Sequence, residues 1–262
     1  MSENILEIKN LSKYFGGLAA VSNCSLEVKK GTITGIIGPN GSGKTTLFNL
    51  IAGNLKSSSG NVTFDQENIT DMPSYELFSK GLLRTFQIAH EFSNLSVLEN
   101  LMMVPGNQSG EKLMTALLKP QLVAREEELV KDKAREVVDF LNLSHLTNEL
   151  AGNLSGGQKK LLELGRTMMV DAKLVLLDEV GAGVNRTLLK DLGTAIEKLN
   201  KEKGYTFCMI EHDMDFIGRL CDPVIVMAEG SVLFEGTVED AKKDEKVIES
   251  YLGRGSKLKD QN

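Results

Sequence analysis

Residues 38–45 of this 262-residue chain read Gly38-Pro39-Asn40-Gly41-Ser42-Gly43-Lys44-Thr45. The run fits the pattern GxxxxGK[ST], whose glycines let successive backbone N–H groups curve around phosphate oxygens. A short apolar segment at 33–37 precedes it, and a helical pattern over 44–53 follows. A helix that starts at such a loop directs its free N–H groups and its positive dipole end toward the anion. The segment therefore predicts a phosphate-binding loop between a strand and a helix.

Two side chains of this loop are expected to act on the phosphates. Lys44 would reach the β- and γ-phosphates, and the hydroxyl of Thr45 would ligate Mg²⁺. The alternative is a glycine-rich turn that holds no ligand. The strand before the loop and the helix after it favour the phosphate-binding interpretation.

A second apolar segment, residues 174–177, ends in the adjacent carboxylates Asp178 and Glu179. Because side chains alternate along a strand, the two are expected to point in different directions and to have different roles. One would meet Mg²⁺ beside Thr45, and the other would orient or activate an attacking water. The alternative is a solvated strand end, since carboxylates are normally exposed.

A glycine-rich helix start lies just before that strand. Ser155 is a favourable N-cap for the helical pattern over 159–170, and Gly156 and Gly157 leave space at the first turn. The helix start could bind a second anion, but on physical grounds alone an ordinary capped helix is the better interpretation.

The middle of the chain differs from its two ends. Residues 96–99 form a capping-box pattern, and residues 125–141 form a long amphipathic helical pattern, with an irregular stretch expected at 105–120. On both sides of this region, strand and helix patterns alternate, which is typical of a parallel sheet covered by helices. The sequence therefore predicts an α/β fold with an inserted helical lobe.

Composition excludes several classes of protein. Thirty basic and 36 acidic residues give a net charge of −6, which argues against a protein that coats nucleic acid. The longest apolar run, 224–228, is far shorter than the roughly 20 residues that a membrane-spanning helix needs. Three cysteines without CxxC spacing and no visible secretory signal indicate a reduced, cytosolic compartment.

Taken in order, the motifs resemble those of the ATP-binding-cassette (ABC) ATPases, over nearly the whole chain. Leu154-Ser155-Gly156-Gly157-Gln158 matches the family's signature motif, and it lies between the phosphate loop and the strand that ends in the carboxylate pair. The remaining markers are Tyr14-Phe15-Gly16 for the aromatic loop, Arg84-Thr85-Phe86-Gln87 for the Q-loop, Gly181–Asn185 for the D-loop and Glu211-His212-Asp213 for the switch-histidine loop.

Four segments of the chain resemble one group within the family more than the others. This group consists of the ATPase subunits of importers for branched-chain amino acids and for related urea or amide solutes. The four segments are Leu83–Gln87, Val97–Leu101, Ile210–Met214 and Tyr251–Gly253.

The resemblance implies a fold and the boundaries of its subdomains. The expected architecture is a P-loop NTPase core, a mixed sheet with flanking helices, together with an N-terminal antiparallel β subdomain and an inserted α-helical subdomain. The core and the β subdomain would occupy 1–92 and 155–254, and the helical subdomain 93–154. Residues 255–262 would form a polar tail.

The resemblance also assigns roles to residues, with ATP and Mg²⁺ as cofactors. Catalysis would fall to Glu179, His212 and Gln87, and Mg²⁺ would be held by Thr45, Gln87 and Asp178. Signature residues Ser155, Gly156, Gly157 and Gln158 would complete the site of the opposite subunit. ATP would be bound by Phe15, Gly38, Pro39, Asn40, Gly41, Ser42, Gly43, Lys44, Thr45 and Thr46.

The partners implied are a second ABC ATPase subunit, identical or not, and transmembrane permease subunits contacted through residues 87–104 and the helical lobe. A solute-binding protein would take part indirectly, and nucleic acid would not. The chain would lie in the cytoplasm, on the inner face of the cell membrane. The alternatives are a soluble ABC ATPase without a transporter, an exporter-type ATPase, and a regulatory module that binds ATP but barely hydrolyses it.

Two positions depart from the usual pattern of the family. Val180 stands where a proline usually follows the carboxylate pair, and Gly181-Ala182-Gly183 after it has more backbone freedom than proline would allow. Asn185 ends the D-loop, where aspartate is usual. Glu179 and His212 are intact. We therefore expect these two departures to change how tightly the dimer interface is ordered, and also the turnover rate.

Overall fold

The computed structural model describes residues 3–85, 91–106, 108–111 and 113–256. These residues belong to two compact units. The first comprises 1–87, 173–181 and 196–262, and the second 88–172 and 182–195. This division groups 155–172 with the helical segment rather than with the core, and the domain limits given above stay a prediction.

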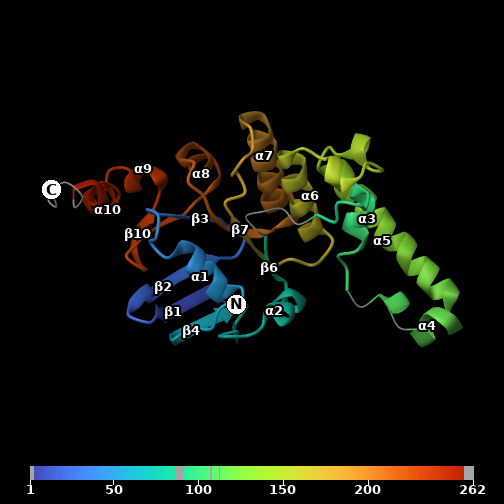
Figure 1. Ribbon diagram of the computed structural model, residues 1–262, viewed down its shortest axis with the longest axis horizontal. Helices are drawn as coiled ribbons and strands as arrows, with labels where there is room; N and C mark the ends of the chain where they lie inside the picture. Colours follow the sequence, from blue (N-terminus) through green and yellow to red (C-terminus); the bar gives the residue numbers. More distant parts are fainter. Residues whose placement is uncertain (1–2, 86–90, 107, 112, 257–262) are drawn as a thin grey trace. The chain divides into compact units, whose positions relative to one another are not determined.

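The first unit contains an antiparallel sheet formed near the N-terminus (Figure 1). A long hairpin, joined at Gly16-Gly17, supplies its two longest strands, and shorter strands extend one side of it. This sheet is the antiparallel β subdomain that the sequence predicts. In spatial order its described strands are β2 (Leu18–Lys29), β1 (Asn4–Phe15), β4 (Ser59–Phe64) and β5 (Glu67–Asn68).

The second sheet of this unit is mixed, as predicted. Its described strands are parallel except for the edge strand that follows a tight turn at Glu229-Gly230. The central strands are buried on both faces, which explains their continuous apolar sequences. In spatial order the strands are β10 (Ser231–Gly236), β9 (Val224–Ala228), β3 (Ile33–Ile37), β8 (Thr206–Ile210), β7 (Leu174–Asp178) and β6 (Leu82–Arg84).

Helix α1 (Lys44–Ile51) joins the two sheets in one core. Its side chains Leu47 and Phe48 are fully buried, and the same cluster contains Leu6 of β1 and Ile36 of β3. Along the chain, the remaining described helices of the unit lie between its strands or after the last of them. They are α2 (Ser74–Lys80), α8 (Met214–Leu220), α9 (Val238–Ala241), α10 (Glu245–Ser256) and the last part of α7 (Arg186–Lys203).

The second unit is helical, as predicted for the inserted lobe. Close packing in its centre depends on Gly165, where an added Cβ would lie 2.7 Å from the side chain of Leu141 and 3.0 Å from that of Val137. Besides the first part of α7, its described helices are α3 (Val97–Met102), α4 (Leu113–Leu118), α5 (Pro120–Phe140) and α6 (Gly156–Met168). None of the helices in the described ranges of the chain is both long and apolar enough to cross a membrane.

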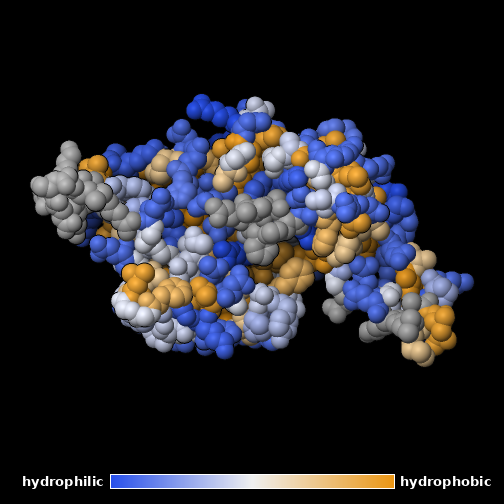
Figure 2. Space-filling model, viewed as in Figure 1, coloured by the Kyte–Doolittle hydropathy of each residue, from blue (hydrophilic) through white to orange (hydrophobic). Residues whose placement is uncertain are grey.

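Two expectations for the helical lobe have different outcomes. The capping box at Ser96 and Glu99 is confirmed, with both of its hydrogen bonds present at the start of α3. The irregular stretch expected at 105–120 is wrong in part, because α4 forms inside it. Its residues are mostly good helix formers, but apart from Thr115 they are apolar and so give no amphipathic signal. Met114 and Leu117 are accordingly exposed, and Figure 2 shows apolar surface over α4.

Candidate functional site

The phosphate loop follows β3 and leads into α1, within the first unit. Gly38 and Gly43 have φ values of +147° and +101°. A Cβ at Gly38 would lie 2.1 Å from the carbonyl oxygen of Met227, and one at Gly43 would lie 2.4 Å from that of Ala20. Both positions therefore exclude every side chain, and the loop takes the open-backbone form that the sequence predicts.

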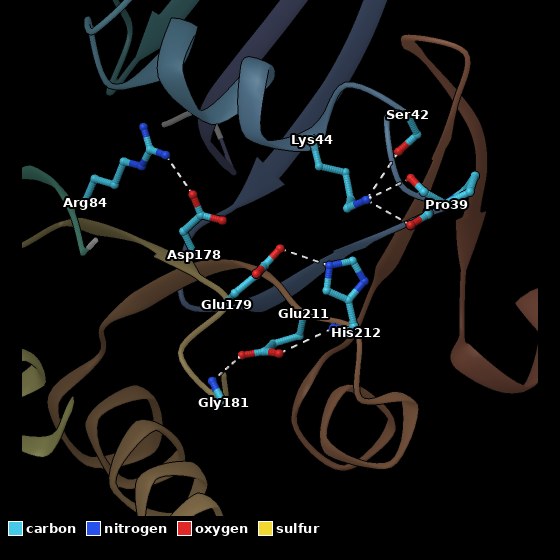
Figure 3. Close-up of polar contacts among 10 residues, drawn as sticks. Pro39, Ser42, Lys44, Arg84, Asp178, Glu179, Gly181, Glu211 and His212 are labelled. Atoms are coloured by element: carbon cyan, nitrogen blue, oxygen red, sulfur yellow. Dashed lines mark hydrogen bonds and ion pairs between the residues drawn. The ribbon is translucent and has the colours of Figure 1, made fainter. Parts of the chain in front are cut away.

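Lys44 is buried against the loop that precedes it. Its ammonium group donates to the carbonyl oxygens of Gly38 and Pro39 at 2.8 and 3.1 Å, and to Oγ of Ser42 at 3.4 Å (Figure 3). Only 5% of the residue is exposed, so the charge is held within the loop instead of extending into solvent. The role of Lys44 toward phosphates stays a prediction.

Asp178 and Glu179 point in different directions, as predicted (Figure 3). Asp178 is the last residue of β7, whereas Glu179 follows the strand with a φ of +49°, so strand alternation alone does not set its direction. Oδ2 of Asp178 accepts a hydrogen bond from Arg84 at 2.7 Å, whereas Oε1 of Glu179 lies 2.9 Å from Nε2 of His212. Since β7 and β8 are adjacent parallel strands, their carboxyl ends bring the two loops to the same sheet edge. The pairing of Glu179 with His212 joins two residues that the sequence analysis selects separately.

The surroundings of Asp178 fit a magnesium ion. Its Oδ1 atom is buried and has no hydrogen-bond partner among the described residues. A buried carboxylate oxygen in this condition is costly unless a cation or a water satisfies it. Mg²⁺ prefers carboxylate, hydroxyl and water oxygens, which Asp178 and Thr45 can provide. Gln87, the third predicted ligand, lies outside the described residues.

Arg84 has a role that the sequence analysis does not identify. It ends β6, and its guanidinium donates to Asp178 at 2.7 Å and to Oδ1 of Asn49 on α1 at 2.6 Å. The Arg84 side chain is 11% exposed and that of Asp178 is 4% exposed, so the pair is shielded from water. Arg84 thus connects the strand before the Q-loop to the carboxylate proposed for the metal and to the helix that follows the phosphate loop.

We expect Arg84→Met to destabilise the first unit, because it leaves the buried carboxylate of Asp178 without its counter-charge. Breaking a buried pair by removing one partner costs about 3–5 kcal/mol. Urea unfolding followed by circular dichroism measures the loss. The double variant Arg84→Met/Asp178→Leu is the control, since it removes both charges and should recover most of the stability. Equal stability of the wild type and Arg84→Met would contradict this account.

Glu211 is a second functional candidate that the sequence analysis mentions only as a member of the histidine motif. It directly follows β8, and only 4% of it is exposed. Its carboxylate accepts hydrogen bonds from the backbone N–H groups of Gly181 at 2.7 Å and His212 at 3.3 Å. Burial and the nearby negative charge of Glu179 raise the pKa of Glu211 above its usual range, although both hydrogen bonds oppose the shift.

The aromatic loop lies at the end of β1. Phe15 is about half exposed, and the ammonium group of Lys13 lies 5.3 Å from the centre of its ring. An exposed aromatic face of this kind can stack on a flat base. The assignment of Phe15 to adenine stays a prediction.

The signature motif starts α6, in the second unit. Ser155 and Gln158 form a capping box, in which the Ser155 side chain accepts from the Gln158 N–H and the Gln158 side chain accepts from the Ser155 N–H. A Cβ at Gly157 would lie 2.5 Å from the side chain of Leu188, so the glycine also permits close packing against α7. The sequence predicts the cap, but no pattern around it indicates this packing requirement. Asn185, in the D-loop, accepts a hydrogen bond from the Leu188 N–H.

Known proteins resemble this chain over nearly its whole length. Residues 21–182 match the family model described as "ABC transporter". A relative from Archaeoglobus fulgidus is 43% identical over 249 residues, covering 95% of each chain. A relative from Methanocaldococcus jannaschii is 42% identical and covers 95% of this chain and 97% of its own. Both are described as probable branched-chain amino acid transport ATP-binding protein LivG.

Solved structures of similar chains point to the same family. A nucleotide-free ATP-binding cassette superposes with a TM-score of 0.81 at 40% identity, covering 94% of this chain and 98% of the other. The ADP conformation of the cassette MJ1267 superposes with a TM-score of 0.81 at 39% identity, covering 96% of this chain and 100% of the other. The dimeric post-hydrolysis state of MJ0796, bound to ADP and Pi, superposes with a TM-score of 0.71 at 25% identity, covering 89% of this chain and 98% of the other. The chain therefore belongs to the ABC transporter family, as one of its ATP-binding and ATP-hydrolysing cassettes.

Proposed function

We propose that this cassette powers an importer for branched-chain amino acids or related small solutes. The names of the relatives that share 42–43% of its residues over nearly full length support this substrate class. The proposed ATP hydrolysis at this site is supported chiefly by the 2.9 Å contact between Oε1 of Glu179 and Nε2 of His212. This contact lies at the same sheet edge as the phosphate loop.

The first step is the binding of ATP. Phe15 would stack on the adenine, and the backbone N–H groups of residues 38–46 would surround the phosphates. Lys44 would exchange its contacts with the loop carbonyls for the β- and γ-phosphates. Because the loop offers mainly backbone N–H donors and one ammonium, the site recognises negative charge and phosphate shape.

Mg²⁺ would be held at Thr45, Asp178 and Gln87, with Asp178 acting through a water molecule. When bound, the ion neutralises part of the phosphate charge that builds up during phosphoryl transfer. The unpartnered Oδ1 of Asp178 supports this assignment. Arg84 would keep the other oxygen of the same carboxylate in place.

Hydrolysis requires a water oriented for attack on the γ-phosphate. Glu179 would accept a hydrogen bond from that water, since its side chain is partly exposed and points away from the metal carboxylate. His212 would contact the γ-phosphate and hold the Glu179 carboxylate by their mutual hydrogen bond. Gln87 would contribute a further contact to the metal or to the water.

A second cassette would complete each site. Ser155, Gly156, Gly157 and Gln158 would present the N-terminus of α6 to the ATP bound by the opposite subunit. The capping box uses the side chains of Ser155 and Gln158 within the helix start, so backbone N–H groups would be the main donors to the phosphate. The dimeric structure of MJ0796 with ADP and Pi supports such a pairing.

Transport itself would occur through separate permease subunits, with the cassette bound to them on the inner face of the membrane. A solute-binding protein would deliver the solute from the other side. Residues 87–104 and the helical unit would contact the permease, and closure of the ATPase dimer would move it.

The importer assignment is tested with inside-out membrane vesicles, or with proteoliposomes that contain the complex copurified with the tagged chain. ATP-dependent movement of radiolabelled leucine, isoleucine or valine is the expected result. Its absence in a complex that still hydrolyses ATP would refute the solute class but not the ATPase activity. Relevant controls are vesicles without ATP and vesicles that carry Glu179→Gln.

Met103→Asp is expected to uncouple transport from hydrolysis. Met103 follows α3 and is 56% exposed, whereas Glu91 and Glu99 nearby are engaged in an ion pair and a capping box. A charge at the exposed methionine would weaken an apolar contact with the permease and leave the nucleotide site intact. We expect solute uptake to fall about tenfold, while phosphate release by the isolated cassette stays unchanged. Tyr75→Asp on α2, a 71% exposed position in the first unit, is the matched control, and an equal loss of uptake there would contradict a specific contact at residues 87–104.

A further inference from the structure

Glu211 is buried in a place where a carboxylate is unfavourable. It is almost entirely removed from water, and the charge of Glu179 lies nearby. Burial and like charge both disfavour the ionised form. An ionised glutamate in this place needs interactions that offset the cost, and two hydrogen bonds to its carboxylate provide them.

The Glu211 carboxylate connects the two backbone segments that carry the catalytic pair. Oε1 accepts a hydrogen bond from the N–H of Gly181, two residues beyond Glu179, at 2.7 Å. Oε2 accepts one from the N–H of His212 at 3.3 Å (Figure 3). The same side chain is therefore bonded to the loop after β7 and to the loop after β8.

The loop after β7 is under conformational strain. Glu179 has a φ of +49°, in the left-handed region that residues other than glycine rarely adopt. Such a residue keeps this conformation only where its surroundings hold it. Two bonds to the end of β8 do so, one from the Glu179 N–H to the carbonyl oxygen of Ile210 at 2.9 Å and the other from Gly181 to Glu211.

The sequence around Gly181 makes this second bond important. Val180 takes the place of a proline that would limit the backbone, and Gly181-Ala182-Gly183 follows. Glycine has the widest choice of φ and ψ, so the covalent chain alone does not fix the position of Glu179. A hydrogen bond from the Gly181 N–H to a buried carboxylate, stronger than one between neutral groups, can supply the missing constraint.

We propose that Glu211 is a positioning residue for ATP hydrolysis. It holds Gly181 and the His212 segment together and thereby keeps Glu179 within hydrogen-bonding distance of His212. Glu211 itself does not touch the nucleotide or the water. The proposal rests on the roles given above to Glu179 and His212 and adds a third member to their arrangement.

The experiment compares Glu211→Leu, which removes the acceptor, with Glu211→Gln, which keeps a carbonyl oxygen for Gly181. In phosphate-release assays we expect the leucine variant to lose about tenfold or more in kcat, because small displacements of reacting groups are costly. The KM for ATP and the affinity for a fluorescent ATP analogue should change less than about twofold. Glu211→Gln should recover kcat to within about threefold of the wild type.

A second readout separates positioning from a general loss of structure. Hydrogen-exchange mass spectrometry should show faster exchange at residues 179–183 in Glu211→Leu and unchanged exchange in α1. If Glu211→Leu does not fold, Glu211→Asp replaces it, since a side chain shorter by one carbon cannot keep the 2.7 Å bond, and the same loss of kcat is expected. Glu163→Leu, which removes another poorly exposed carboxylate, is the matched control.

The outcomes distinguish this inference from the proposed function. Wild-type kcat in Glu211→Leu, together with lost hydrolysis in Glu179→Gln, would overturn the positioning role and leave the proposed function standing. Equal losses of kcat in Glu211→Leu and Glu163→Leu would also overturn it. Full hydrolysis in Glu179→Gln would instead refute the catalytic assignment on which the inference depends.

Discussion

Glu179→Gln is expected to lower ATP hydrolysis by about a hundredfold or more, the usual contribution of a general base or a water-orienting carboxylate. Glutamine has nearly the same size and can still bond to His212, so the loop should keep its structure. Its amide, however, cannot accept a proton from the attacking water. The variant should therefore bind ATP normally and retain it.

Retained ATP should also change the oligomeric state. If two cassettes share each nucleotide, Glu179→Gln should accumulate as a closed dimer during gel filtration with ATP, whereas the wild type should reopen after hydrolysis. Glu202→Gln, at an exposed position on α7, is the control and should behave as the wild type. A variant that remains monomeric at saturating ATP would count against the contribution of Ser155–Gln158 to the partner's site.

Lys44→Ala should weaken ATP binding by about ten- to a hundredfold, because hydrogen bonds to charged groups contribute about 1.5–3 kcal/mol. Turnover should fall below detection, since the β- and γ-phosphates lose their closest positive charge. Isothermal titration calorimetry with ATP and Mg²⁺ measures the change in affinity.

The control for this change is Lys30→Ala, which removes an exposed lysine from the turn before β3. It should leave both affinity and turnover unaltered. Near-normal hydrolysis in Lys44→Ala would mean that the ammonium group does not act on the phosphates. A folded Lys44→Ala protein, checked by circular dichroism, is needed for this comparison.

The parts of the site that sequence analysis predicts depend on local chemistry. The phosphate loop is encoded by glycines at positions where a Cβ would collide with backbone, and the capping boxes at Ser96 and Ser155 depend on residues three apart. Such features can be found from neighbouring residues alone.

The parts that it misses depend on residues far apart in the sequence. Arg84 meets Asp178 across 94 positions, and Glu211 meets Gly181 across 30. Gly157 is required by Leu188, a contact that no pattern around the signature motif indicates. Helix α4 is missed for a different reason, because its six residues, all apolar except Thr115, show no polar–apolar periodicity.

The close fit at Gly38 and Gly43 has a consequence for genetic screens. A methyl group at Gly38 would collide with a carbonyl oxygen of β9, and one at Gly43 with a carbonyl oxygen of β2, so the damage would spread into both sheets. Inactive clones with changes at these two codons should therefore be scarce in the soluble fraction of a lysate, whereas inactive clones altered at codon 44 should be recovered at normal yield. Measuring both the amount of soluble protein and its ATPase activity would distinguish changes that prevent folding from changes that remove only the chemistry.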